Sequence, residues 1–153
     1  MERIYVLKKI IDSITDELVI TSAGRISREV FHLKDRPENF YVQGSMGAAL
    51  GIGIGVALNT NKKVIVIAGD GECLMNLDTL VLMKKLELPN LELYIIDNNQ
   101  YQSTGGQKTI SDSIDFTSIV PCNVFEVKES KIEVSRIDIP HKKIKERFMN
   151  AIH

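Results

Sequence analysis

Residues 64–71 read Val-Ile-Val-Ile-Ala-Gly-Asp-Gly, and this stretch decides the fold. Five apolar, mostly β-branched residues in a row are typical of a strand that is buried on both faces, as in a parallel sheet. A helical pattern over 73–86 and a second apolar run over 91–96 follow. This order of strand, loop, helix and strand predicts an α/β fold, with an open, mostly parallel sheet and helices on both faces.

The segments on the N-terminal side add elements to the same fold. Apolar residues at a 3.6-residue period predict an amphipathic helix over 1–15, and a β-branched run predicts a strand over 18–21. We further expect a helix from about Ser27, a strand over 40–42 and a glycine-rich buried helix over 44–58. No repeat, low-complexity tract or linker interrupts these elements, so we expect a single domain over the whole chain, 1–153.

The C-terminal third has a different pattern. Residues 124–127 and 132–139 both resemble strands, and only a short polar stretch separates them. A parallel crossover needs a dozen or more residues, so the sequence predicts an antiparallel hairpin over 123–139 at the edge of the sheet. A basic amphipathic helix follows from Pro140. Its lysines suit a partner surface or a solvated face, and we favour the solvated face.

Composition excludes several classes of protein. The net charge is -1, from 19 Lys and Arg against 20 Asp and Glu, which gives no bulk attraction to nucleic acid or to an anionic membrane. Cys73 and Cys122 form no CxxC motif, which argues against a zinc module or a disulfide framework. The apolar run over 46–58 is too short to span a bilayer, and we see no signal peptide. We therefore expect a cytoplasmic protein with a small-molecule substrate.

Polar residues follow two neighbouring strands of the predicted sheet. Asp70 lies between Gly69 and Gly71 in a predicted loop, and Asn99 follows the next strand. The carboxyl ends of adjacent parallel strands lie side by side, so a carboxylate and an amide oxygen can converge there on Mg²⁺. Each fragment alone is also a good turn former, but the two together at this spacing favour a metal and phosphate site.

These motifs resemble a known family. Residues 69–71 followed by Asn98 and Asn99 resemble the diphosphate-and-magnesium motif of thiamine diphosphate enzymes. Residues 22–29, 40–47 and 103–107 resemble successive blocks of phosphonopyruvate and sulfopyruvate decarboxylases. The resemblance implies a diphosphate-binding fold with thiamine diphosphate and Mg²⁺ as cofactors.

The resemblance also implies roles for single residues. It makes the side chains of Asp70 and Asn99 and the carbonyl of Tyr101 the metal ligands, and it makes Met46 the apolar residue over which the cofactor bends. Glu72 stands where the family usually has a small residue, so its carboxylate must point away from the diphosphate or cap a helix. The full implied cofactor-binding set is Gly24, Arg25, Ser27, Gly44, Ser45, Met46, Gly69, Asp70, Gly71, Glu72, Asn99 and Tyr101.

By this resemblance the chain is the β-type subunit of a non-oxidative 2-oxoacid decarboxylase, a carboxy-lyase. Its substrate would be phosphonopyruvate or sulfopyruvate, and the sequence leaves that choice open. The alternatives are an acetolactate synthase-like subunit and a non-catalytic remnant that binds a partner chain. No matched block supplies the glutamate that activates the pyrimidine, so no catalytic residue is assigned here. We expect that glutamate from a pyrimidine-binding α-type subunit, in an assembly of two α-type and two β-type chains or larger.

Overall fold

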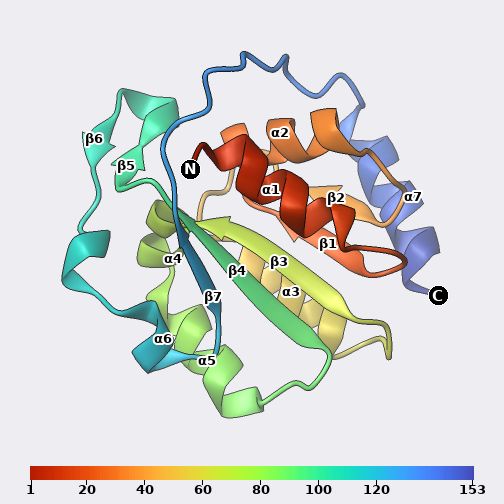
Figure 1. The fold of residues 1–153 in the computed structure, drawn as a ribbon. Helices are drawn as coiled ribbons and strands as arrows, with labels where there is room; N and C mark the ends of the chain where they lie inside the picture. The colour runs from red at the N-terminus through yellow and green to blue at the C-terminus, as the bar shows by residue number, and fades with distance from the viewer.

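The computed structural model describes residues 1–153, and a five-stranded parallel sheet runs through its centre (Figure 1). The strands are β1 (Leu18–Thr21), β2 (Asn39–Tyr41), β3 (Val64–Gly69), β4 (Leu91–Asp97) and β7 (Asn123–Glu126). They lie in the order β2-β1-β3-β4-β7, and every neighbouring pair is parallel. The strand order therefore reverses between β1 and β3. Ligands of open α/β sheets bind at such a switch point, at the carboxyl ends of the strands.

Helices cover both faces of the sheet, as the sequence predicts. Figure 1 shows α1 (Arg3–Asp12) and α2 (Arg25–Leu33) in front of the sheet, and α3 (Ala49–Ala57) behind it. The α3 side also carries α4 (Asp70–Met75), α5 (Leu77–Leu86) and α6 (Phe116–Ile119). The sheet has a hydrophobic core on each face, and successive strand residues point to opposite faces. Val19 therefore belongs to the core under α1 and α2, whereas Leu18 and Ile20 belong to the core on the α3 side.

A glycine lets α3 lie against the middle of the sheet. A Cβ atom on Gly53 would lie 2.2 Å from Cγ2 of Val66 in β3, far inside the contact distance of two carbons. Gly55, two residues further on, faces open space. The single predicted helix over 73–86 is divided into α4 and α5 at Asn76, and helix α4 begins at Asp70, which the sequence placed in a loop.

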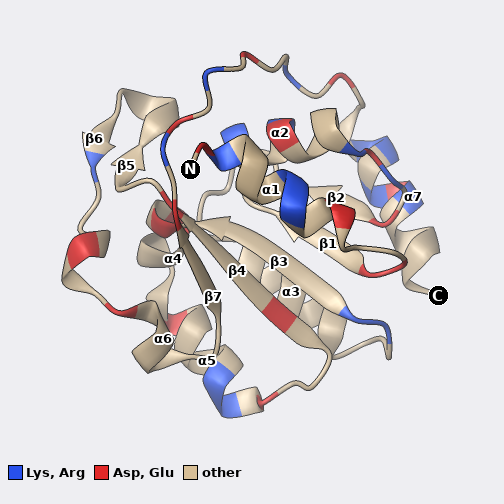
Figure 2. Ribbon diagram, viewed as in Figure 1, with Lys and Arg blue, Asp and Glu red and all other residues tan.

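The last helix, α7 (His141–Ile152), closes the β2 edge of the sheet. Ile144 packs into the core on the α1 side, while Phe148 packs into the core on the α3 side. Arg147 fastens the helix by donating two hydrogen bonds, of 2.6 and 2.8 Å, to the carboxylate of Asp35. Basic residues lie along α7 in Figure 2, and the α7 lysines are exposed, as a polar outer face requires. None of the helices has the length and apolar character needed to cross a membrane.

The predicted antiparallel hairpin over 123–139 is wrong. Strand β7 pairs in parallel with β4, because the preceding residues 98–122 supply the crossover. Residues 129–139 form no strand and run from β7 to α7 across the ends of α1 and α2 (Figure 1). The residue just before this segment is bound to the N-terminus, because the amide of Lys128 donates to the carbonyl of Met1 at 2.8 Å. Alternating apolar residues of this segment, such as Ile137, pack on the core under α1 and α2.

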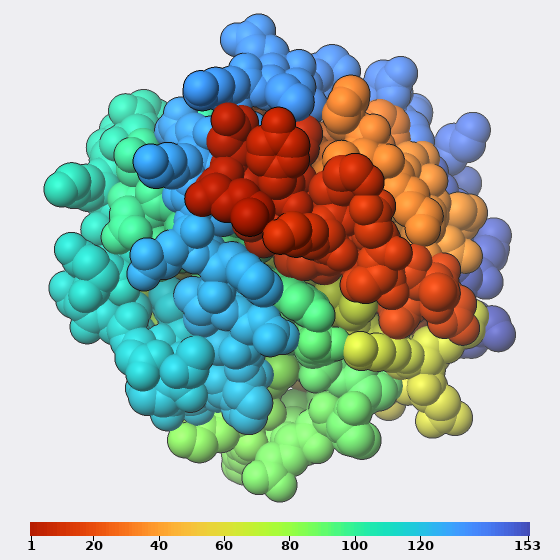
Figure 3. Space-filling model, viewed as in Figure 1, coloured from red at the N-terminus to blue at the C-terminus, as the bar shows by residue number.

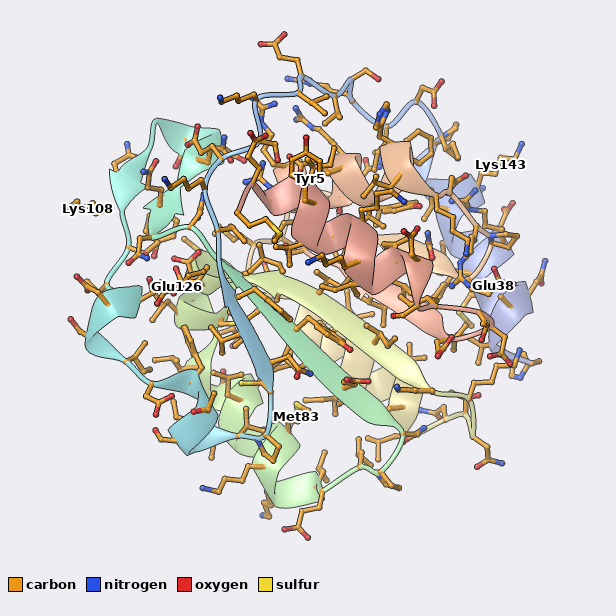
Figure 4. All side chains as sticks on the ribbon, in the orientation of Figure 1. Tyr5, Glu38, Met83, Lys108, Glu126 and Lys143 are labelled. Atoms are coloured by element: carbon orange, nitrogen blue, oxygen red, sulfur yellow. The ribbon has the colours of Figure 1, made fainter.

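The only antiparallel pairing lies elsewhere, beyond the carboxyl end of β4. Strands β5 (Gln100–Tyr101) and β6 (Gln107–Lys108) flank a turn of 3₁₀-helix, Gln102–Thr104. We call residues 100–108 the arm. In Figure 4 the side chain of Lys108 points away from the body of the molecule, so the outer side of the arm is free.

Candidate cofactor site

A cavity of about 360 Å³ opens at the carboxyl ends of the strands, at the switch point of the sheet. The loops after β1, β2, β3 and β4 all contribute to its lining. Ten of the twelve residues implied by the resemblance line it: Gly24, Arg25, Gly44, Ser45, Met46, Gly69, Asp70, Gly71, Glu72 and Tyr101.

Two of the expected residues lie outside this cavity. Ser27 is buried, and its hydroxyl donates to the carbonyl of Ser22 at 2.6 Å, so it holds the turn after β1. Asn99 has a left-handed backbone, with φ of 56°, and its side chain lines a neighbouring hollow together with Asp112. Asn98 lines the main cavity instead. The sequence therefore located the loop correctly, but it did not show which way each amide side chain turns.

Asp70 is buried at the first residue of α4, with only 1% of its surface exposed. Its carboxylate accepts hydrogen bonds from the hydroxyl of Thr109 at 2.6 Å and from the amide of Asn98 at 3.4 Å. Burial raises the pKa of Asp70 above its ordinary value, although the Thr109 hydrogen bond opposes this, and the nearby charge of Asp97 raises it further. A cation would relieve this burial of negative charge.

A chain of hydroxyl groups connects Asp70 to Asn99. The Thr109 and Ser111 oxygens lie 3.0 Å apart. The Ser111 oxygen lies 3.1 Å from Oδ1 of Asn99 and 3.0 Å from Oδ1 of Asp97, so these two acceptors share its single proton. These two residues follow the arm, and no pattern in the sequence marks them. They position the expected ligands of the metal and do not themselves belong to the matched blocks.

The donor set suits Mg²⁺. One carboxylate, one amide oxygen and the carbonyl of Tyr101 are hard oxygen ligands, which Mg²⁺ prefers, and three such ligands would leave positions for phosphate and water. In this structure the Asn99 oxygen accepts a hydrogen bond from Ser111, and the Tyr101 carbonyl accepts one from the amide of Gly106, so both would have to turn to a bound cation. The chain holds no group of three or more His, Cys, Asp or Glu side chains able to bind a metal. A site for a softer metal such as zinc is therefore not built here.

An apolar side chain stands over a glycine floor in the cavity. Met46 is 44% exposed and lies in a loop with positive φ at Gly44, Ser45 and Gly47. A Cβ atom on Gly71 would lie 3.2 Å from Cε of Met46 and 2.5 Å from the ring of Tyr101. Any larger residue at position 71 would displace the tyrosine, so this floor has to be glycine.

The carboxylate of Glu72 caps a helix. It is almost fully buried, and its Oε1 accepts a hydrogen bond of 3.0 Å from the amide of Ala49, the first residue of α3. The first amides of a helix have no partner within it, so this contact satisfies one of them. The unusual glutamate is therefore held by the backbone of α3 through one of its oxygens, which is the helix-capping role expected from the sequence.

Arg3 is the only charged residue of the cavity lining that the sequence did not predict. It donates two hydrogen bonds to Glu29, at 2.6 and 3.1 Å, and a third of 2.6 Å to the side chain of Gln102 in the arm. Ser130 donates to the same glutamate at 3.1 Å. The N-terminal helix, α2, the arm and the 129–139 segment thus meet at one buried ion pair. Figure 3 shows the N-terminal residues beside this late segment on the molecular surface.

Comparisons with known proteins agree with this geometry. The family "Thiamine pyrophosphate enzyme, C-terminal TPP binding domain" matches residues 21–153. Sulfopyruvate decarboxylase subunit beta of Methanocaldococcus jannaschii is 48% identical over 109 residues, which cover 71% of this chain and 58% of that subunit. Phosphonopyruvate decarboxylase of Streptomyces viridochromogenes is 38% identical, over 76% of this chain and 30% of its own length. The chain thus spans less than two thirds of either relative.

The fold has a counterpart among solved structures. A thiamin diphosphate-dependent enzyme isolated from Mycobacterium smegmatis matches with a TM-score of 0.61, over 78% of this chain and 24% of that one. The sequences are 17% identical, so this match shows the fold alone.

Proposed function

This chain belongs to the family of C-terminal TPP-binding domains of thiamine pyrophosphate enzymes, and from this membership we propose its activity. We propose that it is the diphosphate-binding subunit of a non-oxidative 2-oxoacid decarboxylase acting on phosphonopyruvate or sulfopyruvate. The observation that carries the proposal is the cavity at the switch point, where Arg25 at the start of α2, Met46 in the loop after β2 and Asp70 at the start of α4 converge. Relatives with both substrate names support the substrate class.

The residues of the cavity have separate tasks in this proposal. Asp70, Asn99 and the carbonyl of Tyr101 would hold Mg²⁺, and Thr109 keeps the Asp70 carboxylate in place. Arg25 lines the cavity as a permanent cation that suits the diphosphate. Met46 would support the apolar middle of the cofactor. When bound, thiamine diphosphate supplies the electron sink for the electron pair left by departing CO₂.

The side chain of Asn99 would have to rotate before it could bind the metal. The side chain of Asn99 points to Ser111, outside the main cavity. A bound metal would draw this amide toward Asp70, and the hydroxyls of Thr109 and Ser111 already connect the two residues. This proposal therefore predicts that Asn99 changes its partner when Mg²⁺ and the cofactor bind.

We also propose that the working enzyme contains a second chain. The Methanocaldococcus relative is named a beta subunit. The only glutamate that lines the cavity is Glu72, and its carboxylate accepts a hydrogen bond from the backbone of α3. Glu72 is therefore not available to activate the pyrimidine of the cofactor. The acid that activates the pyrimidine is therefore assigned to an α-type partner, in an assembly of two chains of each type or larger.

Cofactor binding tests the proposed site directly. Asp70→Asn removes the charge but keeps an oxygen that can accept from Thr109, so the fold should survive. We expect titration calorimetry to show Mg²⁺-dependent thiamine diphosphate binding in the wild-type complex and at least a tenfold loss of affinity in Asp70→Asn. Asp78→Asn, at an exposed position of α5, is the matched control and should bind as wild type does.

Turnover tests the reaction. The complex should release CO₂ from phosphonopyruvate or sulfopyruvate and form the aldehyde, and the isolated chain should not. Unchanged cofactor binding in Asp70→Asn would contradict the metal assignment. Turnover by the homogeneous isolated chain would contradict the need for a partner. Cofactor binding without turnover of any 2-oxoacid by the complex would favour a non-catalytic remnant.

A further inference from the structure

A second hollow adjoins the cofactor cavity. It has a volume of about 380 Å³, and Gly24 and Gly44 line both spaces. Both glycines have positive φ, and a Cβ atom on Gly44 would meet no other atom within 4 Å. At these two positions only glycine backbone separates the two spaces, and glycine has no side chain that could obstruct a ligand between them. A ligand that extends beyond the cofactor cavity has room to reach the second hollow.

Two arginines from distant parts of the chain line the second hollow. Arg28 comes from α2, and Arg136 comes from the segment between β7 and α7. Neither forms an ion pair within the chain, and no Asp or Glu is among the lining residues. Glu29, the carboxylate next to Arg28 in sequence, is fully engaged by Arg3. The hollow is therefore lined by two cations, the half-buried Arg28 and the exposed Arg136, with no carboxylate among its lining residues.

We propose that this hollow binds the anionic head group of the oxoacid, a phosphonate or a sulfonate, while the oxoacid end extends past Gly44 toward the cofactor cavity. We name it the head-group subsite, with Arg28, Gln43 and Arg136 as the polar side chains available to a ligand. A guanidinium offers several N–H donors in a fixed plane, and two of them from different directions suit a tetrahedral group with three oxygens. The proposal rests on the proposed decarboxylase function and deepens it.

The subsite would select for the head group rather than for the oxoacid. A substrate without an anionic head would offer no counter-charge to the half-buried Arg28 or to the exposed Arg136, and it would gain nothing from this hollow. Arg25 lines the cofactor cavity, whereas Arg28 and Arg136 do not. The arginines of the two spaces are therefore expected to act on different ligands, with Arg25 serving the diphosphate and the other two serving the substrate.

Kinetics of the enzyme complex tests this division. Arg28→Gln and Arg136→Gln should each raise KM for the accepted oxoacid by about 10- to 100-fold, the effect of losing a charge-assisted contact. The dissociation constant of thiamine diphosphate should stay within twofold of wild type. Arg28→Lys keeps the charge without the planar fork and should recover part of the loss. Lys143→Gln, an exposed cation of α7 labelled in Figure 4, is the control and should leave KM unchanged.

A binding titration separates the subsite from the reaction. Methylphosphonate and methanesulfonate carry only the head groups, and we expect the complex to bind at least one of them, with the tighter one naming the substrate. Binding of that probe should weaken in Arg28→Gln. If the complex decarboxylates neither oxoacid, the proposed function fails, and this titration still decides the subsite. Failure of wild type to bind either probe, equal binding in the variant, or a parallel loss of cofactor affinity would overturn the inference.

Discussion

Replacing Arg3 with methionine tests the ion pair that joins the N-terminal helix to the cofactor cavity. The guanidinium makes two charge-assisted hydrogen bonds to Glu29, and the two side chains are only 4% and 1% exposed. In Arg3→Met the carboxylate keeps only the hydroxyl of Ser130. Hydrogen bonds to charged groups contribute about 1.5–3 kcal/mol each, and breaking one side of a buried pair costs about 3–5 kcal/mol. The free energy of unfolding of Arg3→Met should therefore be lower than that of wild type by about 3–5 kcal/mol.

The double variant Arg3→Met/Glu29→Met separates charge burial from packing. It leaves no unpaired charge, so it should recover most of the lost stability. Urea unfolding followed by circular dichroism at pH 7 measures the free energy of unfolding of each variant. The comparison requires that the dependence of this free energy on urea concentration, the m value, is the same in all of them. Lys8→Met is the control, because Lys8 forms an exposed ion pair with Asp12 on the same helix and should change stability by less than about 1 kcal/mol. A cost below about 1 kcal/mol for Arg3→Met, or a double variant as unstable as the single one, would refute this reasoning.

Gly53→Ala should destabilise the chain by about 1–3 kcal/mol because its methyl group overlaps a strand side chain. Gly55→Ala, on the same helix, should stabilise it by up to about 1 kcal/mol, and thermal shifts of the same sign would contradict the packing. Burial would raise the pKa of Asp35, but hydrogen bonds from Arg147 and Tyr41 lower it below its ordinary value. Stability from this group is present above about pH 4 and lost as the pH falls through the lowered pKa. Asp35→Asn should therefore show a smaller loss of melting temperature between pH 5 and 3 than wild type, and identical curves would exclude the effect. Burial also raises the pKa of the Cys73 thiol, so iodoacetamide should modify it only after unfolding, and modification of the folded chain seen by mass spectrometry would disprove its protection.

The sequence predicted the elements whose signals are local. An apolar run sufficed for β3, because a strand buried on both faces needs nothing else to be recognised. The glycine and aspartate that follow it lie at the carboxyl edge of the sheet, where the ends of parallel strands meet, and both line the cavity. The two faces of α7 were also predicted, since a 3.6-residue period separates the buried apolar residues from the exposed lysines.

The remaining features depend on contacts between distant parts of the chain. Arg3 looks like an ordinary charged residue at a helix start, and its partners Glu29 and Gln102 are 26 and 99 positions away. Thr109 carries no motif, although it holds the Asp70 carboxylate. The hairpin over 123–139 failed because alternating apolar residues also suit an irregular segment that packs one side on helices. Alternation alone does not identify a hydrogen-bonding partner for the backbone.

The bridge between the first residues and Lys128 sets an order of events during synthesis. The amide of Arg3 donates to the carbonyl of Lys128, and the amide of Lys128 donates to the carbonyl of Met1. At about 5–20 residues per second, the ribosome needs roughly 6–25 s to make the 125 residues from position 3 to position 128. The first helix emerges early, yet its start is fixed only when most of the chain has been made. A nascent chain stalled before Lys128 should therefore expose the α1 end of the cofactor cavity to proteases, and release past that point should protect it.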